Sequence, residues 1–189
     1  MAVAALARSR VAWRGRAAAA TLAAGWAWIA WAFLAQRYAT INWAAPYFAY
    51  AFAAQAALLL VVGALRGRLV PDVRTGDGVA RGAYALLLFA LFVQPALGAA
   101  PGGSVAAMPL AGLLPDPTAV ATLGFVLTAN GRARWTLLAV PLLWCAASGV
   151  LLLAQESWLA VVMLGAGALA LGLGAAKRGT PPGAGSALR

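Results

Sequence analysis

The sequence contains no histidine, and this absence removes many kinds of active site. Serine–histidine and cysteine–histidine nucleophilic pairs, zinc sites built on paired histidines and haem sites with two histidine ligands all need an imidazole ring. Cys145 is the single cysteine, which excludes a disulfide within the chain, and three methionines offer few further ligands for soft metals. We therefore expect no metal, no cofactor and no enzymatic activity.

Acidic residues are also scarce. The chain has four, and none of them lies within one of its long apolar runs. Ion-coupled transporters usually carry an ionisable group inside the membrane, and an intramembrane protease with two catalytic carboxylates needs both of them at depth. The glycine-rich segment 101–104 neither follows a strand nor carries Lys-Ser/Thr, so it is not a phosphate-binding loop. The sequence thus argues against all three classes of protein.

Apolar side chains, in contrast, are abundant. Of 189 residues, 64% are hydrophobic and only 10% are charged, and the mean hydropathy is +0.86. Such a chain would expose large apolar patches in water, whereas lipid is a compatible solvent for the same surface. The net charge of +10 suggests nucleic acid at first sight. The basic residues instead flank the apolar runs, which favours anchoring to anionic lipid and no nucleic-acid partner.

Six apolar stretches are placed as membrane spans, because about 20 apolar residues cross a hydrocarbon core of about 30 Å. The fourth is short, so it must start deeper, tilt little or borrow length from the apolar segment 106–114. We expect an all-α integral membrane bundle at residues 17–176, between a basic amino-terminal segment 1–16 and a flexible cytoplasmic tail 177–189. Segment 1–16 would lie on the membrane surface or be disordered. The predicted spans are residues 17–36, 44–65, 82–100, 117–129, 135–154 and 158–176.

The basic residues predict the orientation of these spans. Lys and Arg in short loops favour the cytoplasmic side of a membrane. The side that holds both termini receives almost all of them, while the opposite side receives only Arg37, Asp116 and Glu156. We therefore predict that both ends of the chain are cytoplasmic. The basic residues on that side are Arg8, Arg10, Arg14, Arg16, Arg66, Arg68, Arg74, Arg81, Arg132, Arg134, Lys177, Arg178 and Arg189.

Gln55 lies midway along the second span, where an amide needs a hydrogen-bonding partner. It shares a helical face with Tyr47 and Tyr50, and we expect this face to point into the bundle. Phe48 and Phe52 are then expected to point to lipid. Gln55 would either make an interhelical hydrogen bond or form one wall of a polar cavity.

Gln94 precedes Pro95 in the third span. Proline cannot donate to the carbonyl four residues back and disfavours helix at the preceding residue, so we expect a kink or break here. The Gln94 amide could satisfy the backbone groups that such a kink frees. Kinks of this kind are commonly structural, although broken helices also border binding sites.

The nearly uncharged segment 101–118 is expected to pack over the mouth of the bundle or to re-enter the membrane. It ends in Pro-Asp-Pro-Thr, where Asp116 as N-cap and Pro117 at the first helical position predict the start of the fourth span. Asp116 could also meet Arg37, with Glu156 as a competing partner. Exposed pairs of this kind contribute little by themselves.

Four parts of the chain, within residues 36–55, 94–98, 112–124 and 141–144, resemble the domain of unknown function 6064 family of bacterial multi-pass membrane proteins. Its Pro-Asp-Pro-Thr and Pro-Leu-Leu-Trp pieces are the most specific parts of a similarity that spans about residues 20–170. The resemblance implies a membrane bundle without an assigned activity, whose polar residues at one end recur as a set. Many relatives carry Cys where Asp116 stands, and a further amino-terminal segment with another apolar stretch.

Two functions are compatible with these features, in a bacterial inner membrane. The protein could bind or pass a small neutral or lipid-like molecule near the outer leaflet, or it could be a non-catalytic structural or assembly subunit. Membrane lipids are the expected partners in both cases, and the first adds a small-molecule ligand. The candidate polar site comprises Arg37, Asn42, Gln55, Gln94, Asp116, Thr118 and Glu156.

Overall fold

Helices make up all the regular structure in the computed structural model, which describes residues 2–69, 78–98, 112–129 and 134–177. This confirms the expected all-α class. Several long helices pass at one point from α-helical to wider π-helical geometry. The elements are α1 (Ala2–Trp28), η1 (Ile29–Ala35), η2 (Tyr38–Thr40), α2 (Ala45–Leu58), η3 (Leu59–Leu65), α3 (Gly78–Leu88), η4 (Phe89–Val93), α4 (Gln94–Gly98), α5 (Pro115–Thr128), α6 (Arg134–Ala154) and α7 (Leu159–Ala176).

Five helical stretches of the described chain are long and apolar enough to cross a membrane. They coincide with five of the six spans expected from hydropathy, and their length and composition are typical of a membrane protein. The remaining one, the short fourth span expected at 117–129, corresponds to α5, which has 14 residues and is therefore about 21 Å long. The five stretches are Trp13–Thr40, Ala45–Leu65, Gly78–Leu97, Arg134–Ala154 and Leu159–Ala176.

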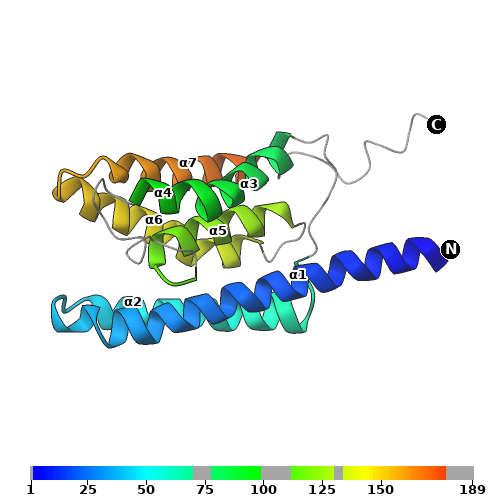
Figure 1. The fold of residues 1–189 in the computed structure, drawn as a ribbon, viewed down its shortest axis with the longest axis horizontal. Helices are drawn as coiled ribbons and strands as arrows, with labels where there is room; N and C mark the ends of the chain where they lie inside the picture. The colour runs from blue at the N-terminus through cyan, green and yellow to red at the C-terminus, as the bar shows by residue number, and fades with distance from the viewer. Residues whose placement is uncertain (1, 70–77, 99–111, 130–133, 178–189) are drawn as a thin grey trace.

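The short helix α5 lies at the centre of the bundle (Figure 1). It packs against α1 on one side and against α3, α6 and α7 on the others. Apart from Asp116, every residue from Pro115 to Thr128 is buried. Because protein surrounds α5, the helix does not have to match the thickness of the lipid by itself. A helix of this length is therefore compatible with a membrane bundle.

Small residues allow α5 to approach its neighbours closely. A Cβ atom on Gly124 would lie 2.6 Å from the backbone nitrogen of Leu87 and 2.8 Å from the backbone oxygen of Ala83, both on α3. Such distances are far inside van der Waals contact, so glycine is required where α3 and α5 meet. Three threonine hydroxyls on α5, those of Thr118, Thr122 and Thr128, donate to backbone carbonyls three or four residues earlier, so these three donors are satisfied within their own helix and the turn before it.

Basic side chains gather at one end of the bundle, which we call the basic end. Arg16 Nη2 donates to the carbonyl oxygen of Leu65 at 3.4 Å, and Arg134 Nη2 donates to that of Gly174 at the same distance. Lys177 Nζ donates to the carbonyls of Leu127 and Ala129 at 2.9 and 3.1 Å. These acceptors end η3, α7 and α5, where carbonyls lack helical partners and the helix dipole is negative. The arginines that indicate orientation thus also cap helices.

Helix α1 is continuous across residue 16, where the sequence suggested a boundary between a surface segment and the bundle. Figure 1 shows the amino-terminal part of α1 extending beyond the other helices at the basic end. Good helix formers explain this continuity, because residues 2–28 are rich in alanine and arginine and contain no proline.

Of the kink or break expected at Gln94, the break is absent. Gln94 has helical dihedral angles, φ −60° and ψ −41°, and α4 continues through Pro95. An irregularity lies in the preceding turn, where η4 adopts π-helical geometry and ends at Val93, two residues before Pro95. Widened turns of this type accommodate an interrupted hydrogen-bond ladder without ending the helix.

The expected orientation of α2 is wrong in part. Phe52 is only 1% exposed, and its ring centroid lies 4.3 Å from that of Trp26 and 4.9 Å from that of Trp144. Tyr47 and Tyr50 are 69% and 77% exposed. The reason is that α2 packs between α1 and α6, so the face carrying Phe52 and Gln55 turns inward and the tyrosine face turns outward.

Candidate functional site

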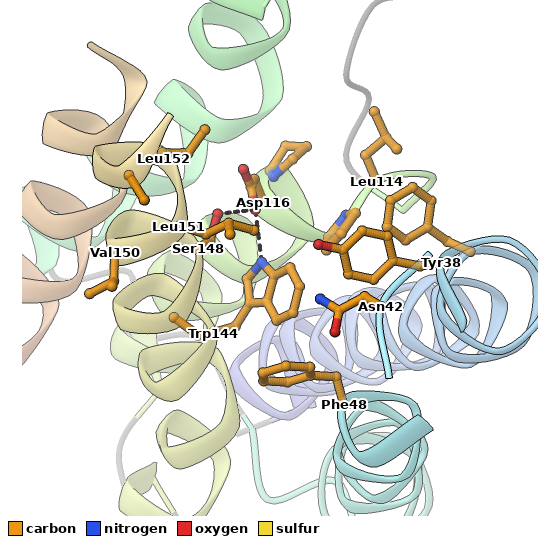
Figure 2. Close-up of a pocket in the computed structure, with 15 residues that line it drawn as sticks. Tyr38, Asn42, Phe48, Leu114, Asp116, Trp144, Ser148, Val150, Leu151 and Leu152 are labelled. Atoms are coloured by element: carbon orange, nitrogen blue, oxygen red, sulfur yellow. Dashed lines mark hydrogen bonds between the residues drawn. The ribbon is translucent and has the colours of Figure 1, made fainter. Parts of the chain in front are cut away.

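A cavity of about 470 Å³ opens at the end of the bundle opposite the basic end, and we call it the Asp116 cavity. Its walls come from η1 and the turn after it, from α2, from the start of α5 and from the second half of α6 (Figure 2). Most of the lining is apolar or aromatic. The lining residues are Phe33, Tyr38, Asn42, Phe48, Leu114, Pro115, Asp116, Pro117, Trp144, Ala147, Ser148, Val150, Leu151, Leu152 and Ala154.

Asp116 is held at the cavity wall by two side chains of α6. Its Oδ1 atom accepts hydrogen bonds from Trp144 Nε1 at 2.8 Å and from Ser148 Oγ at 2.9 Å, drawn as dashed lines in Figure 2. Trp144 and Ser148 are four residues apart, so both lie on the same face of α6. The carboxylate is therefore fixed by neutral donors and joins α5 to α6.

The helix α5 begins earlier than the sequence suggested. Leu114, with extended dihedral angles, precedes the helix, and Pro115 occupies the first helical position in place of Pro117. Asp116 is therefore a first-turn residue and not the N-cap. Either proline suits a first turn, because its ring fixes φ and an N–H at this place would lack a helical partner. The Asp116 side chain is consequently free to turn toward α6.

Aromatic rings form much of the remaining wall. Phe48 and Trp144 meet edge to face, with centroids 5.4 Å apart and an interplanar angle of 87°. Phe33 and Tyr38 stack at 5.8 Å and 15°. Figure 2 places Tyr38 and Asn42 across the cavity from Trp144. The Asn42 Oδ1 atom accepts a hydrogen bond from the backbone N–H of Ala44 at 2.9 Å, which fixes the amide at the wall.

Gln55 lies deeper in the bundle and does not line this cavity. It is fully buried, and its Nε2 atom donates to the carbonyl oxygen of Leu137 at 2.9 Å. In a regular helix that carbonyl would receive the N–H of residue 141, but residue 141 is proline and has none. Gln55 thus supplies the donor that α6 lacks. This confirms the interhelical hydrogen bond and explains its place.

Gln94 is also separate from the cavity. Its Nε2 atom donates to Met163 Sδ at 3.6 Å, which joins α4 to α7. Within the described part of the chain, the Oε1 atoms of Gln94 and Gln55 are both buried without a hydrogen-bond partner. The two glutamines therefore cross-link helices at different places and do not form one polar site.

Arg37 lines a second hollow of about 300 Å³, which we call the Arg37 hollow. Phe33 forms part of the wall of both hollows and stands between them. In the described residues no ion pair joins Arg37 to Asp116, whose carboxylate is engaged by Trp144 and Ser148. The contact between Arg37 and Asp116 that the sequence allowed is therefore not formed. The Arg37 hollow is lined by Trp28, Trp31, Ala32, Phe33, Gln36, Arg37 and Leu113.

Glu156 is exposed in the turn between α6 and α7 and lies outside both hollows. Its φ of 54° is left-handed, and the N–H of Ser157 bonds to the carbonyl of Leu152 while that of Glu156 bonds to Leu153. These two bonds define a Schellman motif, in which glycine is usual at the place of Glu156. Glu156 thus has a role in the turn that needs no ligand.

Thr118 does not line the cavity, but its hydroxyl orders the chain just before α5. Its hydroxyl accepts the N–H of Gly112 and donates to the carbonyl of Leu114, both at 2.6 Å. Residues 99–111 lie outside the described residues, so the expectation that segment 101–118 covers the mouth of the bundle stays a prediction for that part.

The structure brings together two of the predicted site residues, Asn42 and Asp116. The sequence interpretation missed the aromatic side chains beside them and also Ser148. A signal for Trp144 and Ser148 was present, because two hydrogen-bond donors four residues apart on an apolar helix share one face. Among the described residues, no group of three or more Cys, Asp or Glu side chains could hold a metal ion.

Comparison with known proteins identifies a family but no relative of known function or structure. No curated protein and no solved structure matches the chain. Residues 1–178 match the family of unknown function DUF6064. This range includes all the elements that form the cavity. The chain therefore belongs to the DUF6064 family.

Proposed function

We propose that this protein binds a small, mainly apolar molecule in the Asp116 cavity and does not act as an enzyme. The observation that carries the proposal is an open cavity of about 470 Å³ with aromatic walls and a single fixed carboxylate. Ligand sites commonly have a volume of about 300–1,000 Å³, are lined mostly by apolar and aromatic side chains, and contain a few oriented polar groups. The Asp116 cavity has all three properties.

The proposed location is a bacterial inner membrane with both termini in the cytoplasm. The basic end then faces the cytoplasm, because short loops rich in Arg and Lys stay on that side. The Asp116 cavity consequently opens near the outer leaflet. Exposed aromatic residues near the same end support this placement, since Trp and Tyr are enriched at the membrane–water boundary; they are Trp28, Trp31, Trp43 and Tyr47.

A pair of neighbouring substitutions on α6 tests the proposal. Ala147 lines the cavity, whereas Ala146 is exposed on the outer face of the same helix turn. Ala147→Phe should fill the cavity, and Ala146→Phe should add the same side chain toward lipid. We expect native mass spectrometry of the purified protein to show a retained small molecule with the wild type and with Ala146→Phe. Ala147→Phe should lose it while keeping its thermal unfolding temperature.

The alternative proposal is a non-catalytic structural or assembly subunit. The bond from Gln55 to the carbonyl of Leu137 supports a packing role for at least one of the polar residues. Under this alternative the wild type retains no molecule in the cavity, and the two phenylalanine variants behave alike. That outcome would contradict ligand binding.

A further inference from the structure

The Asp116 cavity has a charge that is unusual for this chain. The protein has a net charge of +10, yet among the 15 described residues that line the cavity Asp116 is the one with a charged side chain. Both of its hydrogen bonds come from neutral donors, and both end on Oδ1. Within the described residues no cationic side chain contacts the carboxylate. Among the described residues, the Oδ2 atom has no hydrogen-bonding partner and can accept a donor from a ligand.

The aromatic rings around Asp116 also favour a positive charge. Trp144 both donates to the carboxylate and presents its ring to the cavity, and Tyr38 lies on the facing wall (Figure 2). Ring faces carry partial negative charge and attract ammonium groups within about 6 Å of the centroid. The tyrosine hydroxyl oxygen can in addition accept a hydrogen bond from an ammonium group.

The free-energy cost of removing the Asp116 carboxylate from water also favours a cationic ligand. A charged group that is partly removed from water costs free energy unless hydrogen bonds and an opposite charge compensate it. Trp144, Ser148 and the amino-terminal end of α5 supply hydrogen bonds and a partial positive charge. None of them supplies a full countercharge, which a cationic ligand would provide.

We infer that the ligand of the Asp116 cavity is an amphipathic amine, whose protonated amino group binds Asp116 and whose apolar body lies against the aromatic walls. This inference rests on the proposed function, because it names the chemical class of the molecule bound there. The amine is either a water-soluble compound or the head group of an aminophospholipid. Both sources present the same ammonium group to the carboxylate.

The first test compares two probes of the same shape. Binding of 4-phenylbutylamine and 4-phenylbutanol to the full-length protein in a non-ionic detergent is measured by isothermal titration calorimetry. We expect the amine to bind roughly tenfold to a hundredfold more tightly, because a hydrogen bond between charged groups is stronger than one to a neutral hydroxyl. Equal affinities would overturn the amine inference and leave the proposed cavity function standing. Binding of neither probe would overturn both.

Two acidic residues provide matched variants for this test. Asp116→Asn keeps the shape of the side chain but removes its charge, and it should abolish the preference for the amine. Glu156→Gln removes a charge at the same end of the bundle but outside the cavity, and it should keep the preference. A preference that persists in Asp116→Asn overturns the inference. If Asp116→Asn does not fold, the comparison of the two probes on the wild type still decides the matter.

A second experiment, with phospholipid vesicles, identifies the source of the amine. The wild-type protein is extracted from vesicles that contain equal amounts of phosphatidylethanolamine and phosphatidylcholine with the same acyl chains. Enrichment of phosphatidylethanolamine in the native mass spectrum, lost in Asp116→Asn, identifies a lipid head group. Amine binding without such enrichment identifies a water-soluble amine. Absence of both effects contradicts the inference.

Discussion

At the scale of single residues, Asp116 shows how a polar group is held in an apolar bundle. Its carboxylate oxygen accepts from Trp144 and Ser148, which are 28 and 32 residues away in the chain. Hydrogen bonds that involve a charged group contribute more to stability than neutral ones. The two donors thus fix both the position of the carboxylate and the contact between α5 and α6.

Replacing Trp144 tests this contact. Trp144→Phe keeps an aromatic ring beside Phe48 and Phe52 but removes the N–H that bonds to Asp116. We expect the free energy of unfolding to fall by about 1.5–3 kcal/mol, the usual contribution of a hydrogen bond to a charged group. Unfolding in mixed detergent micelles, followed by circular dichroism, measures the change.

The matched control is Trp158→Phe, since Trp158 is 59% exposed at the start of α7. This variant should unfold with the same free energy as the wild type to within about 0.5 kcal/mol. A Trp144→Phe variant as stable as Trp158→Phe would show that the bond to Asp116 does not contribute measurably to stability.

At the scale of elements, neighbouring helices compensate for irregularities in α5 and α6. Proline at position 141 leaves the carbonyl of Leu137 without its helical donor, and Gln55 on α2 supplies one. The centre of the bundle follows the same principle, because α5 is enclosed by longer helices that compensate for its length. A hydrogen bond that is missing within one helix is thus replaced by a hydrogen bond to another helix.

The hydrogen bond from Gln55 of α2 to the Leu137 carbonyl of α6 predicts that substitutions of Gln55 and Pro141 are energetically coupled. Gln55→Leu should destabilise the protein by about 0.6–1.7 kcal/mol, the range for interhelical hydrogen bonds in membranes. In a Pro141→Ala background the backbone N–H of residue 141 can bond to Leu137, so the same substitution should cost much less. A double-mutant cycle of unfolding free energies measures this coupling.

Gln94→Leu is the control for the cycle, because Gln94 bonds to Met163 and not to α6. Its cost should be the same with Pro141 and with Ala at that position. If Gln55→Leu is equally costly in both backgrounds, the carbonyl of Leu137 does not depend on Gln55.

At the scale of the whole molecule, the two ends of the bundle differ in charge and in structure. The basic end carries Arg16, Arg134 and Lys177 on the carbonyls that terminate three helices. The other end carries the Asp116 cavity and the Arg37 hollow. This asymmetry is the basis for the predicted orientation, since the side rich in Arg and Lys stays in the cytoplasm.

Labelling of introduced cysteines tests the orientation. Arg68→Cys and Glu156→Cys place thiols at exposed positions on opposite ends, in a Cys145→Ser background. A maleimide that cannot cross membranes should label position 156 in intact cells, and position 68 only after the cells are opened. Labelling of position 68 in intact cells, with position 156 protected, would reverse the orientation.

Hydropathy and charge alone determine several properties of this protein. Five of the spans, the all-α class and the gathering of basic residues in alternate loops follow from the sequence, because burial in lipid and attraction to a membrane surface act on each segment by itself. The burial of Gln55 was predictable for the same reason, since an amide in lipid requires a partner wherever it lies.

The rotation of each helix about its axis was decided only in the tertiary structure. Long apolar helices carry little amphipathic signal, so the inward face of α2 follows from its contacts with Trp26 and Trp144 and not from its own residues. The cavity depends on the same contacts, because Asp116, Trp144 and Asn42 come from three segments that packing brings together. Lipid selects the apolar stretches, but side-chain packing selects their partners.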